Sequence, residues 1–335
     1  MVSFQHRTLP AGEAFFQADC ERIFLNKPNT NNRILVMNQQ ELKALINILQ
    51  PIIYGDVETR SQLQEAGINV TRSDFYSEIP TVNEIYNAKK GPDLSRIFPP
   101  NQEMLNFLER LESFAIEFDP PRVTENETEY FWENSQFSYS DALAYYCMIR
   151  LLKPNNILEI GGGYSTLIAK MAVEKNQLGT IKVIEPYPRN FLRNLEGIEL
   201  VMTPFQEIDS ESLAKTLVDG DLVFIDSTHS VKFGSEVLNI YLDFLHLIQH
   251  SCYIHVHDVY LPNPLPVEYM IEHQIFWGEQ YLLYSYLLNN PRTRVLYGSG
   301  YHAKHNPQIL EKLMGGKFGS GGASFWFEQS AGAPK

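Results

Sequence analysis

The stretch NNILEIGGGYSTLIAKMA, residues 155–172, decides the fold. Its apolar residues before the glycines predict a buried strand, the three glycines predict a tight turn, and the residues after Tyr164 have the spacing of a helix. Glycine allows positive φ angles and close approach of the backbone to a ligand. The N-terminus of a helix offers free N–H groups and the positive end of a dipole. The stretch therefore predicts a strand–turn–helix unit that binds a ligand carrying an anionic group.

The residues around the glycines distinguish between classes of ligand. A phosphate loop of the Walker type needs Lys and Ser or Thr directly after its glycines, whereas Tyr164 and Ser165 follow Gly163 here. The GxGxxG pattern of dinucleotide-binding folds is not matched either. Glu159, just before the turn, would repel a pyrophosphate and attract an ammonium group. The turn therefore predicts binding of a zwitterionic amino-acid group.

Strands and helices alternate from about residue 135 onward. Continuous apolar strands are expected at 156–161, 180–186, 198–203, 221–227 and 252–260, with helical segments between them. Such strands predict a parallel sheet covered on both faces, which is a doubly wound, Rossmann-like α/β fold. We expect a mainly helical extension over 1–125, including helices at 39–53 and 101–118, and the α/β domain over 126–330. The ligand crevice should lie at the carboxyl ends of the strands.

The ends of the next strands carry further polar residues. Glu185 and Pro186 follow the second strand about 20 residues after the glycines, the usual place for a carboxylate that binds ribose hydroxyls. Gln206, after the third strand, is expected to face an adenine edge. An amino acid, a ribose and an adenine together make S-adenosylmethionine. The residues predicted to bind this cofactor are Glu159, Gly161, Gly162, Gly163, Tyr164, Ser165, Glu185, Pro186, Gln206 and Asp226.

These motifs resemble those of the class I S-adenosylmethionine-dependent methyltransferases. ILEIGGGYSTLIAK is similar to their first motif, and KVIEPYP to the acidic loop after their second strand. DLVFIDSTHSVKFGSEV and YIHVHDVYLP resemble the fourth and fifth strands of a bacterial subgroup. The resemblance spans about residues 130–330 and implies methyl transfer, although this fold serves O-, N- and C-methylation alike.

Histidines and carboxylates gather at the ends of the fourth and fifth strands. Three interpretations remain open there. A divalent metal is bound by His229, His257 and either Gln280 or Asp258; His229 or His257 is a metal-free general base; or the histidines only form hydrogen bonds. Imidazole suits iron, manganese or zinc, whereas magnesium prefers oxygen ligands. The chain also resembles methyltransferases with a mononuclear iron-type site of two histidines and an amide, which implies iron or manganese rather than magnesium.

Four residues have further expected places. Asp226 binds the cofactor's amino group, binds metal, accepts a proton, or caps a helix. We expect His255 to be packed within the fifth strand. His302 and His305, in a later insertion marked by glycine, are expected at the surface.

Composition limits the partners. The chain has 27 basic and 40 acidic residues and a net charge of −13, which disfavours nucleic acid and anionic lipid as partners. Three widely spaced cysteines without a CxxC pattern argue against a disulfide framework or a zinc knuckle. The sequence shows neither a signal-peptide pattern nor an apolar run of about 20 residues. We therefore expect a cytoplasmic protein without a membrane partner.

The sequence as a whole predicts a methyltransferase for a small-molecule acceptor. The expected acceptor is a small metabolite or a natural-product or carbohydrate intermediate, methylated on oxygen or carbon. The helical extension is expected to form a lid or a homodimer surface. The alternatives are a noncatalytic cofactor-binding module, which the intact glycines oppose, and an NAD-dependent oxidoreductase, which the lack of GxGxxG opposes.

Overall fold

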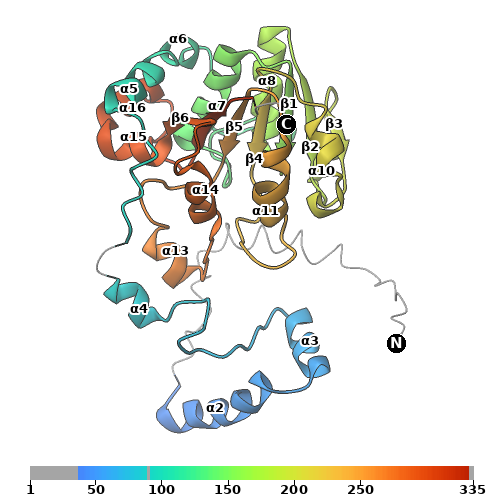
Figure 1. Cartoon of the computed structure of the whole chain (residues 1–335), viewed down its shortest axis with the longest axis vertical. Coiled ribbons are helices and arrows are strands. Elements are labelled where there is room, and N and C mark those ends of the chain that lie inside the picture. Colours follow the sequence, from blue (N-terminus) through green and yellow to red (C-terminus); the bar gives the residue numbers. More distant parts are fainter. Residues whose placement is uncertain (1–36, 89–90, 332–335) are drawn as a thin grey trace. The chain divides into compact units, whose positions relative to one another are not determined.

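The computed structural model describes residues 37–88 and 91–331. The described residues divide into a smaller unit, 37–88, and a larger unit, 91–331 (Figure 1). This division falls within the stretch expected to form the extension, and the boundary expected at residue 125 stays a prediction. Cys20 lies outside the described residues, while Cys147 and Cys252 are buried free thiols.

The larger unit is built on a seven-stranded sheet with the order β3-β2-β1-β4-β5-β7-β6. The first five strands are parallel, and β7 is antiparallel to both β5 and β6. The five predicted strands are confirmed, whereas β6 and β7 were not predicted. The strands are β1 (Asn156–Ile160), β2 (Thr180–Ile184), β3 (Glu199–Val201), β4 (Leu222–Ile225), β5 (Cys252–Val256), β6 (Thr293–Gly298) and β7 (Phe325–Gln329).

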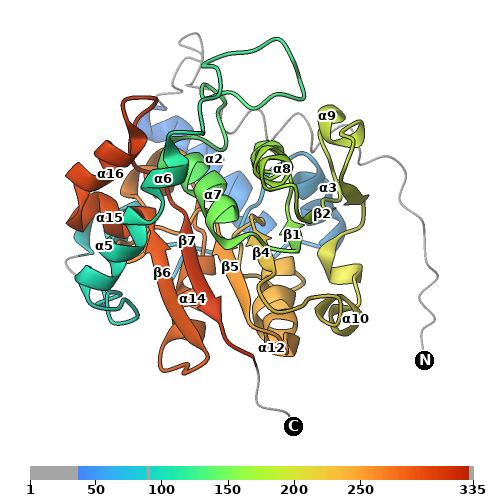
Figure 2. The ribbon, with the colours of Figure 1, turned by 90° about the horizontal axis from the view of Figure 1, so that it is seen from above.

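Helices cover both faces of this sheet (Figure 2). One face carries α5 (Asn101–Glu109), α6 (Glu112–Ala115), α7 (Tyr139–Leu152), α8 (Tyr164–Asn176), α9 (Asn190–Arg193) and α16 (Pro307–Met314). The other carries α10 (Ser210–Ala214), α11 (Glu236–Asn239), the π-helical η2 (Ile240–Phe244), α12 (Leu245–Leu247) and α14 (Glu279–Leu287). The connections include η1 (Phe205–Glu207), α13 (Val267–Glu272) and α15 (Ser299–His305).

The alternation of side chains along β4 shows why the sheet is covered twice. Leu222 and Phe224 point into the core under α7 and α8, and Val223 and Ile225 point into the core under η2 and α14. All four are fully buried, as expected for a central parallel strand. The doubly wound fold predicted from the sequence is therefore confirmed.

His302, on α15, differs from expectation because its side chain is fully buried while His305 is exposed. The His302 ring packs against Tyr297 with 5.0 Å between ring centroids, and its Nδ1 lies 3.1 Å from Asn306 Nδ2. Burial lowers the pKa of His302 to about 4. The expectation of a surface residue was wrong because the insertion folds back as a helix against β6.

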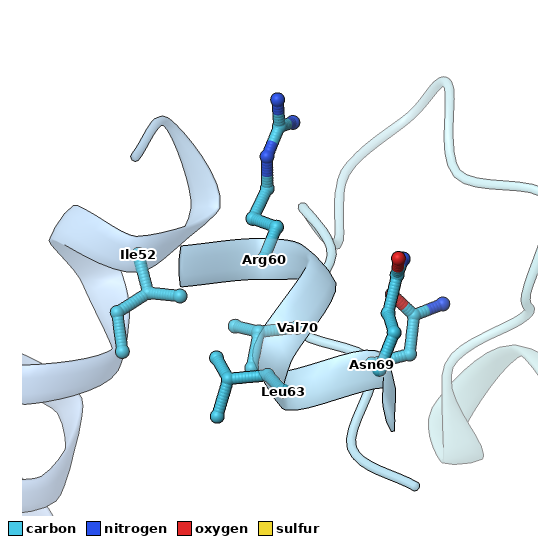
Figure 3. Close-up of a pocket in the computed structure, with 6 residues that line it drawn as sticks. Ile52, Arg60, Leu63, Asn69 and Val70 are labelled. Atoms are coloured by element: carbon cyan, nitrogen blue, oxygen red, sulfur yellow. The ribbon is translucent and has the colours of Figure 1, made fainter. Parts of the chain in front are cut away.

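The smaller unit contains three helices, α2 (Gln39–Ile53), α3 (Val57–Glu65) and α4 (Val82–Asn87), which confirms the helical prediction for its described part. The side chains of Asn38, Asp56 and Thr81 cap their N-termini. A cavity of about 10 Å³ in this unit has room for about one water (Figure 3). It is lined by Ile52, Arg60, Leu63, Gln64, Asn69 and Val70.

None of the described helices is long and apolar enough to cross a membrane. A second cavity, of about 270 Å³, lies on η2, α12 and α14 of the larger unit and not on the loops that follow the strands. It is lined by Tyr241, Leu242, His246, Leu282, Ser285 and Tyr286. Neither cavity is lined by the residues that directly follow β1, β2, β4 or β5.

Candidate active site

The glycine turn fits tightly between the ends of β2 and β4. Gly161 has a φ of +87°, and a Cβ added to it would lie 1.8 Å from the backbone oxygen of Asp226. A Cβ added to Gly162 would lie 2.3 Å from Cγ1 of Val183. Gly163, the N-cap of α8, has open space where a Cβ would be. Packing therefore requires the first two glycines, and the third leaves the helix N-terminus accessible.

Glu159 lies beneath the turn and is fully buried. Its carboxylate accepts hydrogen bonds from the hydroxyls of Tyr145, at 2.8 Å, and Thr166. Burial raises the pKa of Glu159 to about 7, although these two hydroxyls oppose the shift. Because protein groups already bind both of its oxygens, direct contact with a ligand's ammonium group stays a prediction.

Glu185 lies beside the same turn, directly after β2. One oxygen accepts from the N–H of Gly162 at 3.3 Å, and the other accepts from the N–H of Tyr187 at 2.8 Å. Burial raises the pKa of this carboxyl. The structure thus joins Glu185 to the glycine turn. Gln206, by contrast, is exposed on η1, where its Nε2 donates to the backbone oxygen of Gly234 at 3.1 Å.

Two aspartates and two histidines converge at the ends of β4 and β5: Asp226, His229, His257 and Asp258, which we call the His/Asp cluster. Asp226 Oδ1 lies 3.5 Å from both His229 Nε2 and His257 Nδ1. Asp258 lies 3.5 Å from His229 Nε2 and 3.8 Å from His257 Nδ1. Each carboxylate therefore faces both imidazoles.

The backbone at the cluster is unusual. His229 and Asp258 have φ angles of +58° and +55°, in the left-handed region that residues with a Cβ rarely occupy. Such strain is concentrated at functional sites, where the surrounding structure enforces it. The cluster is therefore held in place by its loops.

Two further acids contact the outer nitrogens of the histidines. His229 Nδ1 is hydrogen-bonded to Oε2 of Glu279 at 2.7 Å, and His257 Nε2 lies 3.3 Å from Oδ2 of Asp141. Glu279 and Asp141 are 1% and 4% exposed. The sequence places both acids in helices expected near the crevice, but it does not predict that they contact the histidines. The only signal for them in the sequence is an acid at the start of an expected helix, which is common.

The charges in the cluster are strongly coupled. Burial lowers the pKa of both imidazoles, but the surrounding carboxylates outweigh it, raising the pKa of His229 to about 10 and that of His257 well above its usual value. Burial raises the pKa of Asp226, but the two histidines lower it overall, below its usual range. Burial also raises the pKa of Asp258. The carboxylates thus require positive charge at the centre of the cluster.

Gln280 lies outside this arrangement. Its Oε1 accepts from the backbone N–H of Tyr260 at 3.1 Å, and its buried Nε2 has no partner among the described residues. Three residues offer ligand atoms that all lie within 4.8 Å of one another, namely Asp226, His229 and Asp258. The structure therefore brings His229 and His257 together with two carboxylates and places Gln280 in a different contact.

Aromatic side chains flank the cluster. The Trp277 ring lies 4.5 Å from the ring of His229, and Phe137 lies 4.6 Å from the ring of His257, measured between centroids. His255 is fully buried, bonded to Ser324 Oγ at 2.8 Å and stacked on Trp326, which confirms it as a packed strand residue.

Comparisons with known proteins identify similar proteins for this part of the chain. A family model described as a methyltransferase domain matches residues 158–259, a range that contains the glycine turn and the whole His/Asp cluster. An uncharacterized protein of Archaeoglobus fulgidus is 34% identical over 185 residues, which is 51% of this chain and 80% of the relative.

Solved structures show a weaker similarity. The O-methyltransferase TomG of Streptomyces achromogenes, crystallised with S-adenosylmethionine, is 14% identical, with a TM-score of 0.35 over 76% of this chain and 100% of TomG. An O-methyltransferase of Bacillus cereus is 16% identical, with a TM-score of 0.34 over 71% of this chain and 94% of the other. The domain match and the archaeal relative carry the assignment: the chain belongs to the family of that relative and is a class I S-adenosylmethionine-dependent methyltransferase.

Proposed function

We propose that this methyltransferase transfers its methyl group to an oxygen atom of a small-molecule acceptor, assisted by a divalent transition metal at the His/Asp cluster. The observation that carries the proposal is the convergence of four potential ligand side chains beside the glycine turn. Asp226 connects the two regions, because its backbone packs against Gly161 while its carboxylate faces both histidines.

The glycine turn and Glu185 would hold the cofactor. The N–H groups at the start of α8, beginning at Tyr164 and Ser165, would bind the carboxylate of its methionine part. Each oxygen of Glu185 accepts one backbone N–H and keeps a lone pair for a ribose hydroxyl. Pro186 would fix the chain after Glu185, and Gln206 would reach the adenine edge.

The residues of the His/Asp cluster fit a divalent transition metal. His257 Nδ1 is buried without a hydrogen-bond partner among the described residues, and it faces the carboxylates of Asp226 and Asp258. Two imidazoles with two carboxylates suit iron or manganese better than magnesium. Carboxylates on the outer nitrogens, as Glu279 provides for His229, are typical neighbours of metal-bound histidines.

Such a metal would act as a Lewis acid that lowers the pKa of an acceptor hydroxyl. The chain's own residues would align acceptor and cofactor, so that a bimolecular reaction becomes effectively unimolecular. Phe137 is buried against His257 and Trp277 is half-buried against His229, so both rings limit access of water to the cluster.

A metal-free general base is the second candidate, favoured by the short contact between His229 and Glu279. A base must be unprotonated to accept a proton. The carboxylates that raise the pKa of His229 to about 10 keep the imidazole protonated at neutral pH, despite the opposing effect of burial. This arrangement favours a metal that displaces the proton over a histidine that acts alone.

Calorimetry and elemental analysis test the proposal. Titration should show saturable binding of S-adenosylmethionine and none of NAD, with weaker cofactor binding in Glu185→Ala. Protein purified without chelator should contain about one transition-metal ion per chain. His229→Ala and His257→Ala should lose the metal while still binding cofactor, and full metal retention in both would contradict the ligand assignment.

Three parts of the proposal rest on the sequence. The acceptor is a small metabolite or a natural-product or carbohydrate intermediate, since a net charge of −13 disfavours polyanionic partners. The helical extension forms a lid or a homodimer surface, and the protein is cytoplasmic. Gel filtration across a concentration range tests the homodimer, which would elute with twice the mass of one chain.

A further inference from the structure

We infer that Glu279 is a positioning residue that fixes the ring of His229, so that Nε2 and not Nδ1 faces the His/Asp cluster. The inference rests on the proposed function only in taking His229 to be a metal ligand. The contact itself is independent of whether His229 binds a metal or accepts a proton.

The side-chain geometry is specific. Oε2 of Glu279 lies 2.7 Å from His229 Nδ1, within hydrogen-bond distance, whereas the cluster carboxylates lie 3.5 Å from Nε2. When the Glu279 carboxylate accepts this hydrogen bond, Nδ1 is the donor. The remaining nitrogen, Nε2, then points at Asp226 and Asp258.

The backbone of the same helix turn holds the backbone of His229. The N–H groups of Gly278 and Glu279 donate to the backbone oxygen of His229 at 3.1 and 3.2 Å. Trp277, just before them, packs against the imidazole. One three-residue segment, 277–279, therefore contacts both the left-handed backbone and the ring of His229. Substituting the Glu279 side chain leaves the backbone contacts available.

Glu279 differs in this respect from Asp141, which contacts His257. Asp141 also accepts from the backbone N–H groups of Ala323 and Ser324 and from the hydroxyl of Ser299. Removing Asp141 would leave these donors in and near the loop before β7 without their acceptor. The loop also packs closely on this carboxylate, since a Cβ added to Gly322 would lie 2.3 Å from its Oδ1. Among the described residues, the Glu279 side chain accepts one further hydrogen bond, from the hydroxyl of Ser227 at 3.4 Å, and its Oε1 is buried without a hydrogen-bond partner. Glu279 is therefore the acid whose role can be isolated.

Three substitutions separate position from charge. Glu279→Gln keeps an acceptor oxygen at the same reach, Glu279→Asp keeps the charge but is one methylene shorter, and Glu279→Ala removes both. Glu236→Ala is the matched control, because Glu236 Oε1 accepts from the N–H of Thr228 at 2.7 Å, next to His229 in the sequence, whereas the acids that face the imidazole are Asp226, Asp258 and Glu279. Circular dichroism of each variant checks that it is folded.

The first readout is the Nδ1–H proton of His229, followed by NMR in metal-free protein labelled with ¹⁵N-histidine. We expect a downfield, slowly exchanging resonance in the wild type, Glu279→Gln and Glu236→Ala, and its loss in Glu279→Asp and Glu279→Ala. This pattern does not depend on a metal. Persistence of the resonance in Glu279→Ala, or its absence from the wild type, would overturn the inference.

The second readout is titration of chelator-treated protein with Co²⁺, followed by visible absorption. Loss of an outer carboxylate partner typically weakens metal binding 10- to 100-fold. We expect a weakening of about that size in Glu279→Ala and Glu279→Asp, and less than about tenfold in Glu279→Gln. Equal affinity in all variants would contradict the positioning role. A wild type that binds no Co²⁺ but shows the predicted NMR pattern would contradict the metal proposal and leave the role of Glu279 supported.

Discussion

The glycine turn and the His/Asp cluster lie side by side, but they neutralise their acids in different ways. At the turn, Glu159 accepts two hydroxyl hydrogen bonds and Glu185 accepts two backbone N–H groups. In the cluster, carboxylate oxygens and imidazole nitrogens face each other at 3.5 to 3.8 Å, too far for good hydrogen bonds. Every carboxylate oxygen at the turn therefore has a hydrogen-bond donor within the protein. The carboxylates of the cluster instead need a cation or protonated imidazoles between them.

Gly161→Ala should have the largest effect, because Gly161 connects the two regions. The new Cβ would lie 1.8 Å from the backbone of Asp226 at a φ of +87°, so β1 and β4 would have to separate. We expect a loss of more than about 4 kcal/mol in the free energy of unfolding, measured by urea denaturation. Gly163→Ala, with open space around the new Cβ, is the control and should lose less than about 1 kcal/mol. Similar losses in both variants would contradict this account of the turn.

Glu159→Gln tests whether the Glu159 carboxyl beneath the turn is protonated in the folded protein. Burial raises the pKa of Glu159 from 4.5 to about 7 against the hydrogen bonds that oppose it, so between these values the folded state binds more protons than the unfolded state. This group's contribution to stability is therefore lost as pH rises from about 4.5 to about 7. The variant should gain on the order of 3 kcal/mol in unfolding free energy relative to wild type between pH 4 and pH 8. Parallel pH profiles would show that Glu159 is ionised in the folded protein.

Glu185→Gln tests whether the turn is a cofactor site. The substitution removes the charge while keeping the length and one acceptor oxygen. We expect S-adenosylmethionine to bind about 10- to 150-fold more weakly by calorimetry, since a hydrogen bond to a charged group contributes about 1.5 to 3 kcal/mol. The metal content should not change, because Glu185 belongs to the turn and not to the cluster. Unchanged cofactor affinity would contradict the placement of the ribose.

Gln206→Ala should have the smallest effect. Its side chain is exposed and already bonded to the Gly234 backbone, so a contact with adenine would replace an existing hydrogen bond. We expect cofactor affinity to fall less than about threefold by the same calorimetry. A loss larger than that of Glu185→Gln would place the main binding contact at the adenine and not at the ribose.

The sequence predicted the five parallel strands but missed the two antiparallel strands, β7 and the edge strand β6. The segments that form β1, β2, β4 and β5 are short, mainly apolar runs, which indicate buried parallel strands without knowledge of their neighbours. By contrast, β7 is inserted between β5 and β6 and runs antiparallel to both, and that pairing depends on contacts some 70 residues apart in the sequence. Local pattern carries no information about such pairing.

The same distinction applies to the site. Residues at strand ends, such as Asp226 and His257, could be placed together because parallel strands end at one edge of a sheet. Glu279 and Gln280 are adjacent on α14, but successive helical residues point about 100° apart, so one reaches His229 and the other Tyr260. Which of the two faces the histidine depends on how α14 packs on the sheet, and the sequence of the helix does not reveal it.

The most direct test of the central claim is an anomalous difference map from crystals grown with S-adenosylmethionine and Co²⁺ or Fe²⁺. We predict a single strong metal peak at the His/Asp cluster, within coordination distance of both histidines and at least one of the two aspartates, with the cofactor's ribose at Glu185. A cluster without metal density, in protein that still transfers methyl groups in the presence of chelator, would contradict the account.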